Sequence, residues 1–566
     1  MTSQENPIIS EDFADLLLEY AGDIAIFEPF GSAPVNIIND FAAVVHIPVQ
    51  QMTSNSVLEF GYAAIPSLFG LVSHESLEAS GIFRLRNIPN FDLRGQGVLV
   101  GIIDTGIDYT NPIFQNSDKT TRIVSIWDQT IVSENPPEGR GYGTDFAREQ
   151  INQALQTEDP YQVVPSRDEN GHGTMVAGIA GGAQVPESDF EGVAPGVEFV
   201  VVKLKQAKKY LRDFFFIPDE AVCYQETDLL SAIEYVLNTS VILQKPIVLC
   251  IALNTSQSAH DGRGMTSSYL STVATRSGTG VVVAAGNEGN ARRHYFGLVS
   301  SSVGYDVVEL NVGENEKGFS MELWGQSPSI FSIDILSPSG EYIPRITAVR
   351  NENREINFVF EITTIYIDYR IVESESGDQL ILMRFSNPSP GIWRFNVYER
   401  GNLNIGFHIW LPMEGFISNN TFFIRSDPYT TILALGNAQI PVTITAYNNA
   451  DDSLFINSSK GYTRLGAVKP NIAAPGVNII GPTLDHGFKE FTGTSISCSH
   501  TAGVVAMILE WGVVKGNLLG MSTIEINKLL MRGARREVGV EYPNRDWGFG
   551  ILDIYNVFDS LRSGAV

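Results

Sequence analysis

Four apolar runs along the chain end in small or polar residues, and stretches with the pattern of helices lie between them. The runs are QGVLVGIIDTG (96–106), VEFVVVKL (197–204), KPIVLCIALN (245–254) and GTGVVVAAGNEGN (278–290). GTMVAGIAGGA and ETDLLSAIEYVLN are two of the intervening helical stretches. Apolar strands that alternate with helices are typical of a parallel sheet covered by helices on both faces. The sequence therefore predicts an α/β fold.

Residues 300–427 follow a different pattern, in which apolar and polar residues alternate over short runs. FSIDIL and IWRFNVY each place three apolar residues on one face of a strand, and turns such as SPSG and NPSPG separate such runs. This pattern predicts an antiparallel sandwich or jelly roll. The α/β pattern resumes afterwards, so we expect a β domain inserted between two parts of the α/β domain, 66–299 and 428–566.

Residues 1–65 are predicted to form a small separate α+β unit. SEDFADLLLEYA combines a possible helix cap at Ser10 with apolar residues at helical spacing. VNIINDFAAVVHIPV has the composition of strands.

Composition excludes several classes of protein. A chain of 566 residues is too long for one hydrophobic core. Its 64 acidic residues against 38 basic ones, a net charge of −26, argue against a nucleic-acid groove. Three widely spaced cysteines, Cys223, Cys250 and Cys498, do not form a disulfide framework and favour a reducing compartment.

The sequence also bears on location and metals. No apolar run reaches 18 residues, so no membrane span is expected. The first basic residue is Arg84, so the N-terminus lacks the basic region of a secretory signal, which predicts synthesis and retention inside a cell. No EF-hand-like run of ligands is present, and a calcium requirement stays open.

Four polar residues are candidates for chemistry because functional groups gather at the carboxyl ends of parallel strands. Asp104 ends the first run and Asn287 follows the fourth, while His172 in NGHGTMVAG and Ser495 in GTS precede helices. Asp104 and Asn287 taken singly are equally well explained as turn or cap residues. His172 between two glycines has no such structural explanation.

The order Asp, His, Ser is the order of the subtilisin triad. GIIDTGID, NGHGTMVAG, VVVAAGNEGN and FTGTSISCSHTAG resemble the four signature segments of subtilisin-like serine proteases (peptidase family S8), and KPNIAAPGVNI resembles the segment before the nucleophile. The resemblance implies that Ser495 is the nucleophile, His172 its base and Asp104 the residue that holds the imidazole. Asn287 would donate to the oxyanion together with the Ser495 backbone N–H.

The remaining polar residues of FTGTSISCSH are predicted to be structural. Ser497, two positions after Ser495, points to another face of the helix, and both Ser497 and Ser499 are expected to be helix-packing hydroxyls. Cys498 is expected to be a small buried apolar residue. His500 lies too far along the helix to reach Ser495. Ser499 also stands where the family usually has a proline, so we expect the start of this helix to differ slightly from that of other family members.

The resemblance implies two walls for the first specificity pocket, formed by Ala252, Leu253 and Asn254 on one strand and by Ala284, Ala285 and Gly286 on the other. Asn254 replaces a usual glycine, and we expect it to narrow or repolarise the pocket. A further insertion, KQAKKYLRDFFFIPDE (205–220), either recognises a specific protein or is a packed surface loop; both interpretations stay open.

Several further features resemble the Csp germination proteases of spore-forming clostridia. They are SLEASGIFRLRNIPNFDLRGQGVLVGIIDTGIDY, the β insert, YPNRDWGFGILDIYNVF and the absent signal peptide. The resemblance implies that residues 1–65 are a propeptide that assists folding and then inhibits. Its last residues, VLEFGYAA (57–64), would lie in the groove, with self-cleavage between about Glu59 and Pro66.

For function, the resemblance implies a protease of the spore cortex or coat region that cleaves the inactive precursor of a cortex hydrolase and requires no cofactor. The β insert is expected to add rigidity, with carbohydrate binding as the alternative. Two rival functions remain: a regulator that is held shut by its propeptide and acts by binding, and a general degradative subtilase. Neither nucleic acid nor membrane is an expected partner.

Overall fold

The computed structural model describes residues 6–71, 80–86, 92–185, 188, 190–348, 352–401, 403 and 405–562. Its largest sheet has nine strands, and all neighbours in it are parallel except at β7 and β25. From one edge the order is β25 (Ser453–Leu454), β24 (Val442–Asn448), β12 (Thr279–Ala284), β10 (Ile247–Ile251), β5 (Leu99–Asp104), β8 (Glu198–Lys203), β6 (Ile123–Asp128) and β7 (Thr144–Ala147), with β26 (Ile472–Pro475) also beside β24. The predicted α/β fold is confirmed.

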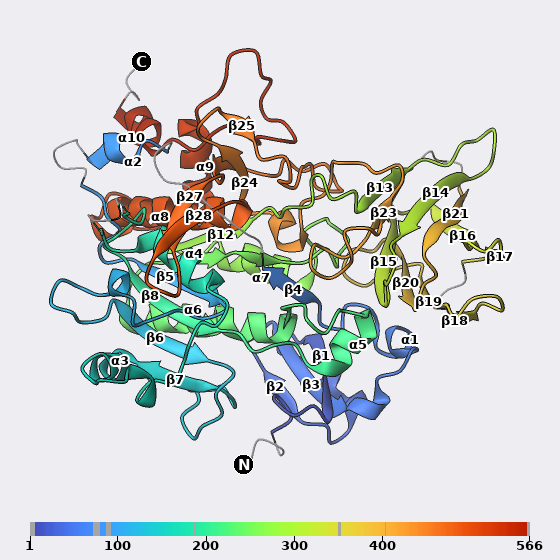
Figure 1. The fold of residues 1–566 in the computed structure, drawn as a ribbon, viewed down its shortest axis with the longest axis horizontal. Helices are drawn as coiled ribbons and strands as arrows, with labels where there is room; N and C mark the ends of the chain where they lie inside the picture. Colours follow the sequence, from blue (N-terminus) through green and yellow to red (C-terminus); the bar gives the residue numbers. More distant parts are fainter. Residues whose placement is uncertain are drawn as a thin grey trace.

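Helices cover both faces of this sheet (Figure 1). Val100 and Ile102 of β5 share one core with α4 (His172–Gly181) and α8 (Thr494–Leu509). Leu99 and Ile103 face the opposite core with α6 (Glu226–Leu243) and α7 (Met265–Val273). Because both faces are buried, the central strands are apolar throughout.

One helical stretch, Thr494–Val514, is long and apolar enough to cross a membrane, although no membrane span was predicted from the sequence. Burial inside the protein accounts for its composition, since 89% of the apolar window is covered by the rest of the chain. Further helices are α2 (Ile82–Arg86), α3 (Arg148–Ala154), α5 (Lys209–Phe215), α9 (Thr523–Gly533) and α10 (Ile554–Arg562), and β27 (Ile479–Pro482) and β28 (Phe488–Phe491) form a hairpin.

The inserted β domain lies at the right-hand end of the molecule in Figure 1 and consists of two antiparallel sheets around one core. The first sheet has the order β13 (His294–Gly297), β22 (Phe407–Trp410), β15 (Gly318–Gly325), β20 (Gln379–Ser386), β19 (Thr364–Arg370) and β18 (Glu352–Asn357). The second has the order β17 (Tyr342–Ile346), β16 (Ile330–Leu336), β21 (Gly391–Arg400), β14 (Asp306–Val312) and β23 (Phe422–Phe423). An inserted β domain was predicted, although its sheets begin at His294 rather than after residue 300.

The N-terminal unit is built on a three-stranded antiparallel sheet in the order β1 (Phe13–Glu19), β3 (Ala42–Pro48) and β2 (Val35–Ile37). The helix predicted over SEDFADLLLEYA is wrong, because most of this segment is strand β1. Leu16 and Leu17 are both buried, in different cores on opposite faces of the strand. An apolar run buried on both faces lacks the alternation that distinguishes a strand from a helix.

The segment after this sheet differs from the prediction. Residues 57–64 do not line a groove: they belong to helix α1 (Ser56–Phe60) and the turn after it. Val57 and Tyr62 are buried there, and the Tyr62 hydroxyl donates to Glu322 Oε1 at 2.6 Å. Strand β4 (Leu68–Leu71) instead lies between two other strands of the main domain, β9 (Tyr224–Gln225) and β11 (Leu253–Asn254).

Candidate active site

Three elements bring Asp104, His172 and Ser495 together. Asp104 is the last residue of β5, His172 is the first residue of α4, and Ser495 is the second residue of α8. His172 Nδ1 lies 2.8 and 2.9 Å from the two carboxylate oxygens of Asp104, and its Nε2 lies 3.2 Å from Ser495 Oγ. All three side chains are buried. This is the geometry of a hydroxyl nucleophile with a base that a carboxylate orients.

Thr105 and Asp168 hold this arrangement in place, and the sequence analysis missed both. The Thr105 N–H donates to Asp104 Oδ1 at 2.7 Å, and its hydroxyl donates to Asp168 Oδ1 at 2.8 Å. Asp168 also accepts the Gly171 and Thr174 N–H groups, so it caps the start of α4. An Asp four residues before His172, in DENGHG, was a capping signal that could have indicated this role.

The glycines around His172 are explained by close approach of the backbone. A Cβ on Gly173 would lie 2.1 Å from the Gly106 carbonyl oxygen. Gly171 has φ 90°, a left-handed conformation that L-residues with side chains rarely adopt. The chain can therefore turn into α4 directly beside the end of β5, which places the imidazole against Asp104.

Asn287 lies on the other side of the nucleophile and is oriented by Thr494. Its Oδ1 accepts the Thr494 N–H at 3.2 Å and the Thr494 hydroxyl at 3.1 Å. Since the oxygen of the carboxamide is held in this way, its nitrogen is the end that can donate to an oxyanion. Ser495 also belongs to the first turn of α8, where backbone N–H groups lack helical partners and the helix dipole favours negative charge.

The other polar residues of FTGTSISCSH have structural partners. The Ser497 hydroxyl donates to the Ala474 and Pro475 carbonyls, and the Ser499 hydroxyl donates to the Ser495 carbonyl at 2.7 Å. His500 Nε2 lies 2.6 Å from Ser80 Oγ, so the hydrogen-bond partner of this imidazole is a serine outside the triad. Helix α8 begins at Thr494 and continues through Ser499, so the missing proline leaves the helix regular.

Cys498 is not a competing nucleophile. Burial, and then the neighbouring Cys250 thiol at 3.9 Å, raise the pKa of Cys498 well above its usual range. A thiol that stays protonated is a poor nucleophile. The nucleophile of this stretch is therefore the Ser495 hydroxyl.

A buried Asp–His–Ser series beside an oxyanion-directed amide is the active-site arrangement of a serine hydrolase. The sequence profile of the subtilase family matches residues 95–312 and 419–550, and the interruption falls within the β insert. The chain belongs to the subtilase family. This assignment confirms the resemblance seen in the four signature segments.

Several known proteases are similar to this chain in structure or in sequence. The structure of the Clostridium perfringens CspB protease superimposes with a TM-score of 0.77 at 28% identity, covering 86% of this chain and 97% of that one. The subtilisin-like protease SBT3.3 of Arabidopsis thaliana is 23% identical over 75% of this chain. The PII-type proteinase of Lacticaseibacillus paracasei is 22% identical over 84% of this chain. The matched regions span 57% and 26% of those two longer relatives.

Strand β4 occupies the groove next to the nucleophile. Leu71 and Gly70 pair with Leu253 and Asn254 in antiparallel register. The other edge of β4 pairs with β9. Toward its C-terminus β4 approaches Ala252, whose carbonyl oxygen lies 3.1 Å from Ser495 Oγ. A segment of the chain itself thus pairs with the strand that was predicted to form one wall of the first specificity pocket.

Asn254 crosses the space between the two predicted walls of the first specificity pocket. It is fully buried; its Nδ2 donates to the Ala284 carbonyl at 3.0 Å, and its Oδ1 accepts the Leu435 N–H at 3.0 Å. Leu433 closes in from the other wall, because a Cβ on Gly286 would lie 2.6 Å from its side chain. Asn254 and Leu433 thus both lie against the wall formed by Ala284, Ala285 and Gly286.

Insertion 205–220, which includes α5, contacts the N-terminal unit. Lys208 Nζ lies 2.8 Å from Asp15 Oδ1, and Tyr210 exchanges hydrogen bonds with the backbone of Asp15. Burial alone would raise the pKa of Asp15, but Lys208 and His46 overcome it and lower the pKa to about 2. The insertion is therefore packed against the N-terminal unit of its own chain, and recognition of a separate protein by residues 205–220 stays a prediction.

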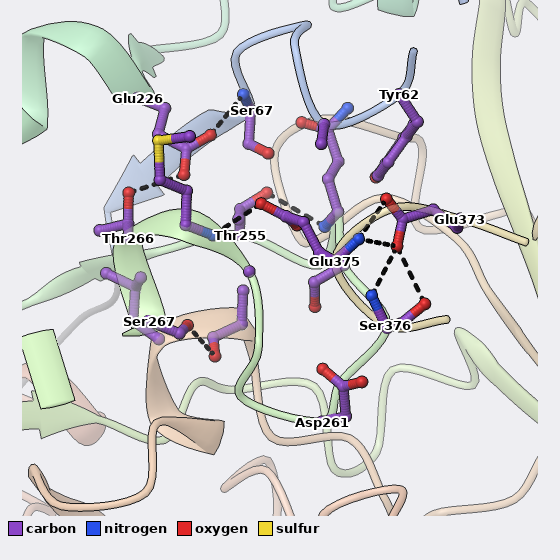
Figure 2. Close-up of a pocket in the computed structure, with 18 of the residues that line it drawn as sticks. Tyr62, Ser67, Glu226, Thr255, Asp261, Thr266, Ser267, Glu373, Glu375 and Ser376 are labelled. Atoms are coloured by element: carbon purple, nitrogen blue, oxygen red, sulfur yellow. Dashed lines mark hydrogen bonds between the residues drawn. The ribbon is translucent and has the colours of Figure 1, made fainter. Parts of the chain in front are cut away.

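An acidic pocket lies beside the segment that leads into β4. Figure 2 shows Glu226, Glu373, Glu375 and Asp261 around it, with Ser67 from the N-terminal side. Burial, and then the neighbouring Glu226 and Glu373, raise the pKa of Glu375 well above its usual range. Within the part of the chain that the structure describes, no three His, Cys, Asp or Glu side chains gather in a cluster suited to a metal ion.

Proposed function

We propose that this chain is a serine endopeptidase that cuts itself once and then processes a specific protein precursor. The observation that carries the proposal is strand β4, a peptide segment paired with Leu253 and Asn254 that runs toward a nucleophile 3.2 Å from its base. Substrate backbone would bind in the same antiparallel manner, which places a scissile carbonyl against Ser495.

The chemistry follows from the contacts of the triad. Ser495 Oγ attacks the carbonyl carbon while His172 Nε2 takes its proton, and the imidazolium later returns that proton to the leaving amine. Asp104 holds the imidazole through Nδ1 and stabilises its cation. Asn287 and the Ser495 N–H donate to the oxyanion, and losing one such donor typically costs about 3–4 kcal/mol of transition-state stabilisation.

The self-cleavage site is proposed to lie C-terminal to Leu71. Strand β4 is the part of the N-terminal region that pairs with the groove, and its C-terminal end approaches Ala252 and Ser495. The bond cut would then fall within residues 72–79, outside the described residues, rather than between Glu59 and Pro66. Residues 1–71 would act as the propeptide.

The cleaved propeptide is proposed to stay bound. It adds a strand to the groove and buries the Asp15–Lys208 ion pair against the catalytic domain. A bound propeptide would block the groove to most proteins. This favours a protease that cleaves one specific protein able to displace the propeptide over a general degradative enzyme. The similarity to the C. perfringens CspB protease supports a germination role, with the precursor of a cortex hydrolase as the suspected substrate and the spore cortex or coat as the location.

N-terminal sequencing of the purified protein tests self-cleavage. We expect a new terminus within 72–79 in the wild type and a full-length Ser495→Ala variant. A wild type that stays uncut would instead support the rival function, a regulator that acts by binding. Incubation with a candidate pro-hydrolase tests the second step, and cleavage by Ser495→Ala would overturn the assigned nucleophile.

A further inference from the structure

The groove strand β4 is covered on its outer side by a turn of the inserted β domain. The turn, residues 413–417, follows β22, and we call the side chains of Met413 and Phe416 the roof. Both are at least 97% buried, with exposed fractions of 2% and 3%. They belong to the same apolar cluster as Leu68 of β4. A peptide in this groove is therefore enclosed rather than open to solvent.

Gly70 lies directly beneath the roof. A Cβ built on Gly70 would lie 3.2 Å from Met413 Cε, 3.3 Å from Met413 Sδ and 3.3 Å from Phe416 Cε1. The φ of Gly70 is not in the left-handed region, so its backbone does not require glycine. Space is what favours glycine here, because a larger side chain would have to displace two buried apolar side chains.

Side chains of β4 alternate between the two sides of the strand. Phe69 points away from the roof, into the core with Leu229 and Leu253, whereas Leu68 lies in the cluster of the roof. Gly70, the residue paired with Asn254, is in contact range of both roof side chains. The lack of space for a side chain is therefore shown at the position of Gly70.

The turn that carries the roof is held by the catalytic domain. The Glu414 N–H donates to Glu288 Oε1 at 3.0 Å, and Glu288 also forms a buried ion pair with Arg293 at 2.7 Å. Glu288 is the residue after Asn287, and its own N–H donates to Ser459 Oγ. These contacts involve no residue of the N-terminal unit, so they do not depend on β4 being present.

We propose that Met413 and Phe416 determine specificity by favouring glycine over larger residues at the substrate position that pairs with Asn254. This inference rests on the proposed proteolytic function, because it assumes that a protein substrate replaces β4 beneath Met413 and Phe416. Alanine requires the flexible end of Met413 to yield by a few tenths of an ångström, whereas Val, Leu or Phe requires the roof to move away. The substrate class is thus a protein segment with glycine at one fixed position before the cut.

The first test uses the full-length Ser495→Ala chain and hydrogen exchange of the β4 amides, which does not depend on catalysis. Gly70→Leu should release β4 and speed its exchange by about tenfold or more. Adding Met413→Ala and Phe416→Ala should return the rate to within about threefold of the parent. Gly520→Leu is the matched control, because Gly520 has open space around it and no positive φ. Unchanged exchange in Gly70→Leu, or no recovery in the triple variant, would overturn the proposal.

The second test uses the processed enzyme and peptides with Gly, Ala or Leu at the position of Gly70. The wild type should cleave the glycine peptide about 10- to 100-fold faster than the leucine peptide. In the Met413→Ala, Phe416→Ala enzyme that ratio should fall to within about threefold, with the glycine peptide still cleaved. Equal cleavage by the wild type would reject the roof as a specificity device. If no peptide is cleaved by either enzyme while the exchange results hold, the proteolytic function fails and the roof remains a selector of bound segments.

Discussion

Two buried aspartate–histidine pairs in this molecule have nearly the same geometry and different surroundings. Asp104 and His172 lie 2.8 Å apart in the active site, and Asp15 and His46 lie 2.7 Å apart where the N-terminal unit meets the catalytic domain. In both pairs the Nδ1 of the imidazole contacts the carboxylate, and each of the four side chains is nearly inaccessible to solvent. The pairs alone therefore do not distinguish chemistry from structure.

The third group in each cluster makes the difference. His172 Nε2 meets the Ser495 hydroxyl, so the imidazole can remove a proton from a nucleophile. Among the described residues no hydrogen-bond partner reaches His46 Nε2, and Asp15 is instead bound by the Lys208 ammonium. A carboxylate shared with a cation stabilises packing, whereas one that serves a histidine beside a hydroxyl supports catalysis.

The same substitution in both pairs should separate these roles most strongly. Asparagine keeps a donor toward the carboxylate but cannot accept a proton as a base. His172→Asn should lower kcat/KM by about 10⁴- to 10⁶-fold, as loss of a triad residue does. His46→Asn should leave kcat/KM of the processed enzyme within a few-fold of the wild type. Peptide hydrolysis measures both, and more than about 1% residual activity in His172→Asn would contradict the assignment of the base.

The second prediction reverses the comparison by measuring stability. In the Ser495→Ala background, Asp15→Ala leaves the Lys208 charge buried and unpaired, and should cost about 3–5 kcal/mol of unfolding free energy. Asp104→Ala removes the carboxylate that contacts His172 Nδ1 but leaves no lysine charge unpaired, and should cost about 1–3 kcal/mol. Urea unfolding measures both. Adding Lys208→Met to Asp15→Ala should recover part of the loss, and a loss that persists in full would show that the charge is not its cause.

The pH range of the Asp15 cluster follows from its pKa. The carboxylate of Asp15 has a folded pKa of about 2, below its unfolded value, so its stabilising contribution is present at pH above about 4. That contribution is lost as the pH falls through 2. Ionisation of the Asp15 carboxylate itself therefore adds no pH dependence to stability between pH 5 and pH 8.

The sequence predicted the catalytic residues because each lies in a local motif. Asp104, His172, Asn287 and Ser495 end strands or begin helices within short stretches that can be recognised without knowing the rest of the fold. The alternation of the β insert and the apolar strands of the main sheet were equally local. The catalytic motifs and the strand patterns depend only on residues that are close to one another in the sequence.

Features that depend on contacts between distant segments were missed. Strand β4 is defined by its pairing with Tyr224 and Leu253, more than 150 positions away along the chain, and nothing in SLFGL indicates those partners. The contact of Lys208 with Asp15 is of the same kind. Thr105 was missed for another reason: it acts through single hydrogen bonds that leave no periodic pattern.

A third prediction uses buried histidines that have no carboxylate. Burial lowers the pKa of His260 to about 3 and that of His294 to about 4. The unfolded chain binds protons at these residues below about pH 6.5 while the folded chain does not, so stability falls as the pH drops from 6.5 toward 4. Each residue should contribute about 1.4 kcal/mol per pH unit in that range.

Urea unfolding of the Ser495→Ala chain at pH 7, 6 and 5 measures this slope. The His294→Phe variant should show a slope smaller by about 1.4 kcal/mol per pH unit. An unaltered slope in His294→Phe would mean that this histidine is protonated in the folded state.

The smallest expected effect concerns Asn254, which carries no charge and takes no part in proton transfer. Its side chain bridges the Ala284 carbonyl and the Leu435 N–H, so it lies between the predicted walls of the first specificity pocket. Asn254→Gly should admit larger side chains before the cut and raise kcat/KM for such peptides by about tenfold, with little change for small ones. Asn254→Asp keeps the volume and should not widen the preference. If both variants retain the wild-type preference, Leu433 rather than Asn254 limits the pocket, because it is the other side chain that closes against Gly286.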